Sequence, residues 1–162
     1  MSKNFLIALG IGVVCVAIAV MWVVHMQRGA YIDLPGKVLK VRTAPLDEAS
    51  AVAVVDFRVT NPADYPFVIR KVTMAMEDSA GNESEGQTVS EVDARQLFQV
   101  IPLLGQKFND TLLMRDSIPP HNSWDRMVAA RFEVPESKLE ARKRLVVRIE
   151  EVDGKVFDLS DK

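Results

Sequence analysis

The chain has 162 residues, and its 20 Lys and Arg side chains nearly balance its 22 Asp and Glu, giving a formal net charge of −2. Proteins that bind nucleic acid gather a surplus of basic side chains into a patch, so this balance argues against nucleic acid as a partner. The single cysteine, Cys15, lies in an apolar stretch near the N-terminus, which excludes a disulfide-based scaffold for the rest of the chain.

The apolar stretch Phe5–Met26 contains no acidic or strongly basic side chain. A helix of this length would measure roughly 30 Å, which is the thickness of the hydrocarbon core of a bilayer. Residues 1–28 are therefore predicted to form an N-terminal tail and a single transmembrane helix. The small residues Ala17-Ile18-Ala19 would also suit a cleaved signal peptide, but strong apolarity continues through Val24, which favours an uncleaved anchor.

Basic side chains on the two sides of this stretch bear on its orientation. Lys3 precedes it, whereas Arg28, Lys37, Lys40 and Arg42 follow it. A count of charges would keep the C-terminal side in the cytoplasm, but long folded domains cross membranes largely regardless of charge. We predict a single-pass membrane protein whose folded domain is extracytoplasmic, which in a bacterium means periplasmic.

Residues 29–36 contain two glycines and a proline and are predicted to be a linker, which leaves residues 37–162 as one domain of ordinary size. Strands are predicted at Lys37–Thr43, Ala51–Thr60 and Phe67–Glu77. The second of these alternates apolar and polar residues over its length, which indicates one buried face. The polar residues Asp78–Gln87 are predicted to form a loop.

An amphipathic helix is predicted to begin at Ser90. Asp93 stands three residues later, as in a capping box, and apolar residues then recur at helical spacing until Pro102 stops the helix. No regular structure is assigned to Leu103–Asp116. The remaining predicted elements are a strand at Trp124–Val134, a short helix within Pro135–Arg144, and a hairpin of Leu145–Val152 and Lys155–Leu159 around Asp153-Gly154.

These elements predict a mostly β domain with six or seven antiparallel strands and one inserted amphipathic helix, for which a β-sandwich is the natural architecture. The stretch Val55–Pro62, followed by Tyr65–Ile69, resembles the strand, Asn-Pro turn and strand of immunoglobulin-like sandwiches. It is most similar to the water-stress and hypersensitive-response domain of type-2 late-embryogenesis-abundant proteins. It also resembles bacterial single-pass proteins of unknown function that carry a sandwich behind an anchor.

A second short segment supports this resemblance, since Ile118-Pro119-Pro120 leading into Trp124–Val134 is similar to the proline turn and strand of the same domains. Together the similar segments cover about half of the folded part, and the inserted helix departs from a plain sandwich. The resemblance implies an immunoglobulin-like fold and an extracytoplasmic, non-enzymatic role. It assigns no functional residues.

Catalytic and metal-binding patterns are weak in this sequence. His121 is the one histidine of the folded part and lies in a Pro-Asn turn, so its nearness in sequence to Asp116 and Ser117 does not make a catalytic triad. The acidic loop Asp78–Glu85 lacks the alternating acids and central glycine of a calcium-binding loop. We therefore predict no enzymatic activity, no metal site and no cofactor.

Two apolar segments are candidates for a surface that docks a partner. Leu103–Arg115 either packs into the core as an irregular connection or presents such a surface, and Tyr65-Pro66-Phe67 lies at a predicted tip of the sandwich. The candidate partner surface consists of Tyr65, Phe67, Phe108 and Leu112.

The function predicted from these features is that of a membrane-anchored, non-catalytic interaction or structural module, which binds another envelope or membrane protein. The alternative is a small-ligand-binding or enzymatic domain, with a site assembled from residues that are distant in sequence.

Overall fold

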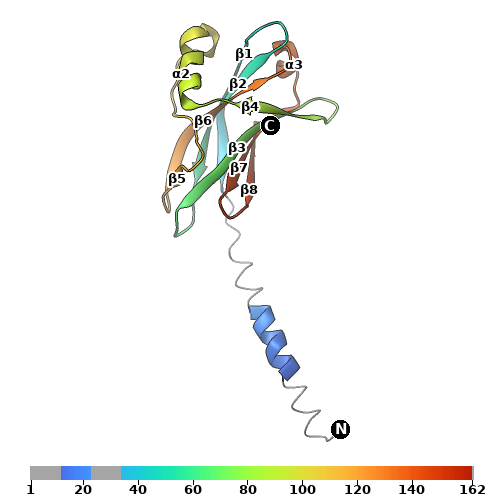
Figure 1. The fold of residues 1–162 in the computed structure, drawn as a ribbon, viewed down its shortest axis with the longest axis vertical. Helices are drawn as coiled ribbons and strands as arrows, with labels where there is room; N and C mark the ends of the chain where they lie inside the picture. The colour runs from blue at the N-terminus through green and yellow to red at the C-terminus, as the bar shows by residue number, and fades with distance from the viewer. Residues whose placement is uncertain (1–11, 23–33, 162) are drawn as a thin grey trace, which may run out of the picture. The chain divides into compact units, whose positions relative to one another are not determined.

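The structure, a computed structural model, describes residues 12–22 and 34–161 (Figure 1). The chain forms two units, Met1–Asp33 and Leu34–Lys162, which are described separately. Residues 12–22 of the first unit are helical, and both flanks of the predicted span Phe5–Met26 lie outside the described residues. Within the described residues, no helix combines the length and the apolar character needed to cross a membrane.

The second unit is mostly β, and its strands pair antiparallel, as the sequence predicts. Its strands are β1 (Gly36–Pro45), β2 (Ala51–Thr60), β3 (Phe67–Glu77), β4 (Glu83–Thr88), β5 (Ser117–Ile118), β6 (Ser123–Phe132), β7 (Arg144–Glu151) and β8 (Val156–Ser160). Its helices are α2 (Glu91–Val100), the 3₁₀ turn η1 (Pro102–Leu104) and α3 (Glu136–Glu140). β1 begins within the predicted linker, and Leu34 is already buried in the core.

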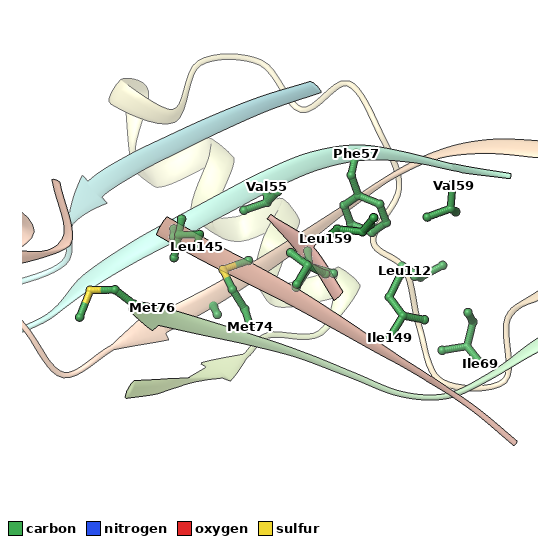
Figure 2. Close-up of a cluster of buried hydrophobic side chains, with 14 of the residues drawn as sticks. Val55, Phe57, Val59, Ile69, Met74, Met76, Leu112, Leu145, Ile149 and Leu159 are labelled. Atoms are coloured by element: carbon green, nitrogen blue, oxygen red, sulfur yellow. The ribbon is translucent and has the colours of Figure 1, made fainter. Parts of the chain in front are cut away.

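The strands lie in the order β1-β2-β6-β4-β3-β7-β8, and β5 pairs with β3. β4 joins the two arms of this sheet, because its first residues pair with β3 and its last two, Gln87 and Thr88, pair with β6. The two sheets expected for a sandwich are thus joined into one curled antiparallel sheet. The main core lies between the two arms, with its labelled side chains filling the space between the ribbons in Figure 2.

Gly86 lies where β4 leaves β3 for β6. A Cβ atom at this position would come within 2.7 Å of the ring of Phe132, which is buried on the neighbouring strand β6. A glycine in a strand often marks such a close approach, because any side chain would displace its neighbour. The polar residues of this region show no strand periodicity and predict a loop. Pairing with strands on both sides makes it a strand.

A second, smaller core lies on the outer face of β2, where the sequence analysis expected a solvent-exposed face. α2 and η1 cover this face, and Val52 and Val54 pack there with Ala94 and Leu104. Almost every residue of β2 is therefore buried. The helix begins as predicted, because the backbone N–H of Asp93 donates to the Ser90 hydroxyl at 3.2 Å.

The Asn-Pro turn after β2 has a defined role in the fold. Asn61 is fully buried, and its side-chain amide donates to the carbonyl oxygens of Tyr65, at 2.8 Å, and of Ile118, at 3.0 Å. Its side-chain oxygen accepts from the backbone N–H of Ala63 at 3.0 Å. One asparagine thus fixes the β2–β3 connection to the segment that precedes β6, because a buried amide requires such partners.

Candidate functional site

Residues 89–116 lie between β4 and β5, and we call them the outer layer; they contain α2, η1 and the predicted irregular segment, whose Leu112 inserts into the main core. Figure 1 shows α2 beside β1, β2 and β6. The chain leaves the sheet at the end of β4 and reaches β1 at η1. It then returns across β2 and β6, where the N–H of Leu112 donates to the carbonyl of Met127 at 2.8 Å, and continues to β3.

A buried ion pair fixes the middle of the outer layer to the sheet. Arg42 of β1 binds Asp56 of β2 at 2.5 Å, and the two side chains are only 7% and 4% exposed. Arg42 also donates to the carbonyl oxygens of Leu104 and Gln106, each at 2.8 Å. Asn109 donates to the second oxygen of Asp56 at 2.9 Å. The side chains of Arg42 and Asp56 therefore bind three residues of the irregular segment, which are Leu104, Gln106 and Asn109.

Two aromatic rings complete the environment of Arg42. Its guanidinium carbon lies 4.7 Å from the ring centre of Phe98 and 6.0 Å from that of Phe108. Lys40 lies 5.9 Å from the Phe108 ring. Cations at these distances are attracted to the faces of aromatic rings. Phe108 thus lies beside two cationic side chains although its own side chain is largely in solvent.

Glu91 ties the first turn of α2 to the end of the returning segment. Its carboxylate accepts from the backbone N–H of Thr111 at 2.9 Å and pairs with Lys107 and Arg95, each at 2.9 Å. Burial would raise the pKa of Glu91, but the hydrogen bonds from Thr111, Lys107 and Arg95 outweigh it and lower the pKa to about 2. The carboxylate therefore stays ionised and keeps these contacts throughout the neutral and mildly acidic range.

The structure separates the four predicted surface residues. Phe67 is 0% and Leu112 is 3% exposed, and both belong to the main core, so neither can form a surface in this fold. Figure 2 shows Leu112 near Ile69 and Ile149. The correction has a simple cause: residue type indicates apolarity but does not tell whether another element covers it. Tyr65, at 45%, and Phe108, at 64%, are exposed, the first in the β2–β3 connection and the second in the outer layer.

Two further apolar side chains of the outer layer are exposed: Leu103, within the candidate segment Leu103–Arg115, and Val100, before it. Val100 is 77% and Leu103 is 74% exposed, more than Phe108. An apolar groove of about 420 Å³ lies between α2 and the β1–β2 end of the sheet. Leu46, Val52 and Val100 are among its lining residues. Val100 falls outside the apolar stripe of the helix, and this break in periodicity is the signal that could have identified it.

The groups considered for catalysis have other partners. His121 Nε2 lies 2.9 Å from a carboxylate oxygen of Asp64, and both side chains are exposed. Asp116 accepts from the backbone N–H of Leu113 at 2.9 Å, and Asp78 accepts from the N–H groups of its own turn. In the part of the chain that the structure describes, no three His, Cys, Asp or Glu side chains are grouped to hold a metal ion.

Three consecutive basic residues, Arg142, Lys143 and Arg144, follow α3, and the last of them begins β7. Arg142 pairs with Asp161 at 2.8 Å, with both side chains largely buried, while Lys143 and Arg144 both bind Glu77 at the end of β3. Hydrogen bonds from Lys143 and Arg144 lower the pKa of Glu77. The pairs with Glu77 thus connect the start of β7 to the end of β3. The pair between Arg142 and Asp161 connects the residues after α3 to the end of β8.

One buried carboxylate lies at the end of β7 that adjoins the Asp153-Gly154 turn. Glu151 is 2% exposed, and its Oε2 atom has no hydrogen-bond partner among the described residues. Burial raises the pKa of Glu151; Lys155 acts in the opposite direction and Asp153 in the same direction. The folded state therefore favours the protonated form of this side chain.

Glu151→Gln should stabilise the domain in a pH-dependent way. Below the unfolded-state pKa of Glu, about 4.3, residue 151 is neutral in both the wild type and the glutamine variant. As pH rises through the raised folded-state pKa, the wild type loses stability and the glutamine variant does not. The free energy of unfolding should thus favour the variant by about 1–2 kcal/mol at pH 8 and by almost nothing at pH 4. Urea denaturation at both pH values measures this difference.

The control for this measurement is Glu133→Gln at an exposed position. It should change the free energy of unfolding by less than about 0.5 kcal/mol at either pH. An equal gain for the Glu151 variant at pH 4 and pH 8 would show that its carboxylate is not the cause.

The sequence matches no protein-family profile and no curated protein. Among solved structures, it is similar to the X-ray structure of Northeast Structural Genomics Consortium target SoR45. The identity is 11%, 80% of each chain is covered, and the TM-score is 0.34.

Proposed function

We propose that this protein is a non-catalytic interaction module whose outer layer docks another envelope or membrane protein. The observation that carries the proposal is the combination of three largely exposed apolar side chains with a rigid support. Val100, Leu103 and Phe108 are each at least 64% exposed, and the buried Arg42–Asp56 pair and its hydrogen bonds hold the layer on which they lie.

The rigid support of the outer layer would favour the affinity of binding. An interface that must be ordered on association loses affinity to conformational entropy, whereas a preorganised one does not. Scattered apolar residues are normal on protein surfaces, but these three lie within nine residues of each other, and Val100 also lines an apolar groove. The buried centre of a protein interface is more apolar than the rest of the surface and is enriched in aromatic side chains such as that of Phe108.

The proposal includes the membrane anchor and the fold family. Phe5–Met26 would span the bilayer once, with the domain extracytoplasmic; its uncharged composition and length support this reading. The domain would be an immunoglobulin-like sandwich modified by β4. The two facing arms and the buried Asn61 at the Asn-Pro turn support that relationship.

The test of this function is copurification from membranes with substitutions in the outer layer. Phe108→Glu should reduce recovery of a stoichiometric partner at least tenfold, since it places a charge in the middle of an apolar contact. The thermal midpoint of the isolated protein should change little, because Phe108 is exposed and contributes only weak cation–π contacts.

The matched control is Val156→Glu, which makes the same kind of change at an exposed apolar residue on β8, outside the outer layer. It should leave partner recovery unchanged. Equal recovery with the Phe108 variant and the wild type would contradict docking by the outer layer.

A further inference from the structure

Lys40 lies beside Phe108, one of the three apolar residues of the proposed docking surface. Its side chain is exposed on β1, with the ammonium group 5.9 Å from the centre of the Phe108 ring. Among the described residues, no carboxylate forms an ion pair with that group. Its neighbour across the β1–β2 pair is Asp56, but the Asp56 carboxylate is already bound by Arg42 and Asn109. Lys40 therefore keeps a positive charge without a counter-ion next to an exposed aromatic ring.

The other acids near this part of the sheet are also engaged. Asp110 of the outer layer pairs with Lys107 at 3.5 Å. Lys37, on the same strand and the same side of the sheet, forms no ion pair among the described residues either. Hydrogen bonding from Arg58 is the main cause of the lowered pKa of Asp125, and Lys37 contributes to it only at longer range. The whole chain carries a formal net charge of −2, so this local positive surplus does not follow from overall composition.

A bulge in β1 places another apolar side chain between the two lysines. The register with β2 shifts between Val38 and Lys40, which leaves Leu39 outside the ladder, and Leu39 is 43% exposed. β1 is an edge of the sheet, and bulges and lysines on an edge strand hinder the addition of a further strand. A partner at this place would therefore make its contacts with side chains rather than through the backbone.

The rest of the docking surface is uncharged. Residues 96–106 contain no ionisable side chain, and they include the exposed Val100 and Leu103. The surface thus combines an apolar part with a positively charged edge at β1. Charges at the rim of an interface are complementary between partners and exclude partners of the wrong sign.

We propose that the docked partner presents an acidic segment in which a carboxylate stands next to a large apolar side chain. The carboxylate would pair with Lys40, and the apolar side chain would pack on Phe108 and Leu39. A basic segment would instead be repelled by Lys37 and Lys40. This inference rests on the proposed docking function and adds the charge of the partner to it.

The test titrates the full-length chain, in an uncharged detergent, with a labelled random copolymer of glutamate and tyrosine, and follows fluorescence anisotropy. The copolymer carries acidic and aromatic side chains in every order, so the result does not depend on the sequence of the natural partner. It should bind saturably, about tenfold more tightly than polyglutamate and than a copolymer of lysine and tyrosine, and added salt should weaken binding. Absence of saturable binding, or equal binding of polyglutamate, would overturn the proposal.

Lys40→Met tests the charge, because it removes the ammonium group and keeps an apolar side chain of similar length. Affinity for the glutamate–tyrosine copolymer should fall about fivefold, and the thermal midpoint should change little, since the side chain is exposed. The matched control is Lys138→Met on α3, another exposed lysine without an ion pair among the described residues, and it should bind like the wild type. Equal affinity of the two variants would overturn the role of Lys40.

The copolymer result and the copurification result are separable. If Phe108→Glu removes the partner but Lys40→Met leaves copolymer binding unchanged, the docking function stands and the acidic character of the partner is wrong. If Phe108→Glu leaves partner recovery unchanged, both the docking function and this inference fail. Displacement of the copolymer by glycerophosphoglycerol, the soluble headgroup of an anionic lipid, would assign the lysines to a lipid surface and overturn the assignment to a protein.

Discussion

Asp56→Ala is expected to lower the free energy of unfolding by about 3–5 kcal/mol, because it leaves the charge of Arg42 buried without its counter-ion. The remaining partners of Arg42 are two carbonyl oxygens and the rings of Phe98 and Phe108, none of which carries a full charge. The substitution also removes the acceptor for Asn109, so the irregular segment loses a second contact. Guanidinium denaturation followed by circular dichroism measures the loss.

The matched control is the exposed ion pair between Arg58 and Asp125, which connects β2 to β6 at 2.6 Å. Both of its side chains are more than a third exposed, so Asp125→Ala should cost less than about 1 kcal/mol. A loss below 1 kcal/mol for Asp56→Ala as well would contradict the role given to the buried pair. Replacing both Arg42 and Asp56 with leucine should recover part of the stability, since an apolar pair leaves no buried charge.

Leu112→Ala is expected to destabilise the domain by about 2–5 kcal/mol, since it removes a core side chain and leaves a cavity that the surrounding strands fill only partly. Leu112 is 3% exposed and belongs to the core between the two arms. The adjacent Leu113 is 40% exposed, so Leu113→Ala should cost no more than about 0.5 kcal/mol. Urea denaturation of both variants measures the difference.

The comparison between these neighbours tests the path of the segment. If both variants lose less than about 1 kcal/mol, the returning segment does not insert Leu112 between the arms. If both lose as much as the Leu112 variant is expected to lose, Leu113 is buried as well as Leu112.

Elements with strong local signals could be predicted from the sequence. The Ser90 cap with the apolar stripe of Leu97 and Phe98 gives the bounds of α2 to within one residue. Asp153-Gly154 predicts the β7–β8 hairpin, which the structure contains. The two-residue type I′ turn that these residues prefer is not formed, because among them only Gly154 has a positive φ, 84°, and its N–H donates to the carbonyl of Glu151. In these cases the residues that determine the structure are neighbours in the chain, so their pattern is visible.

Features that depend on distant partners could not be predicted. β4 is a strand because it pairs with β3 and β6, and its own polar sequence does not indicate that these strands lie beside it. Phe108 and Leu112 are both apolar members of one irregular segment, yet one is exposed and the other is core. The buried pairing of Arg42 and Asp56 follows from the register of β1 and β2, including the irregularity near Val38. A sequence pattern alone does not determine that register.

The position of Arg42 on β1 has a mechanical consequence. β1 is the first strand of the folded unit and an edge of the sheet, and it is covalently continuous with the N-terminal residues through Leu34. Only a few residues of β1 separate Gly36 from Arg42, which holds the outer layer at Leu104 and Gln106. Tension between a partner on the outer layer and the N-terminal segment would therefore run along β1 and its neighbour β2. The arm formed by β3, β7 and β8 would share this load, because the returning segment is hydrogen-bonded to Ile69 of β3 and inserts Leu112 into the main core.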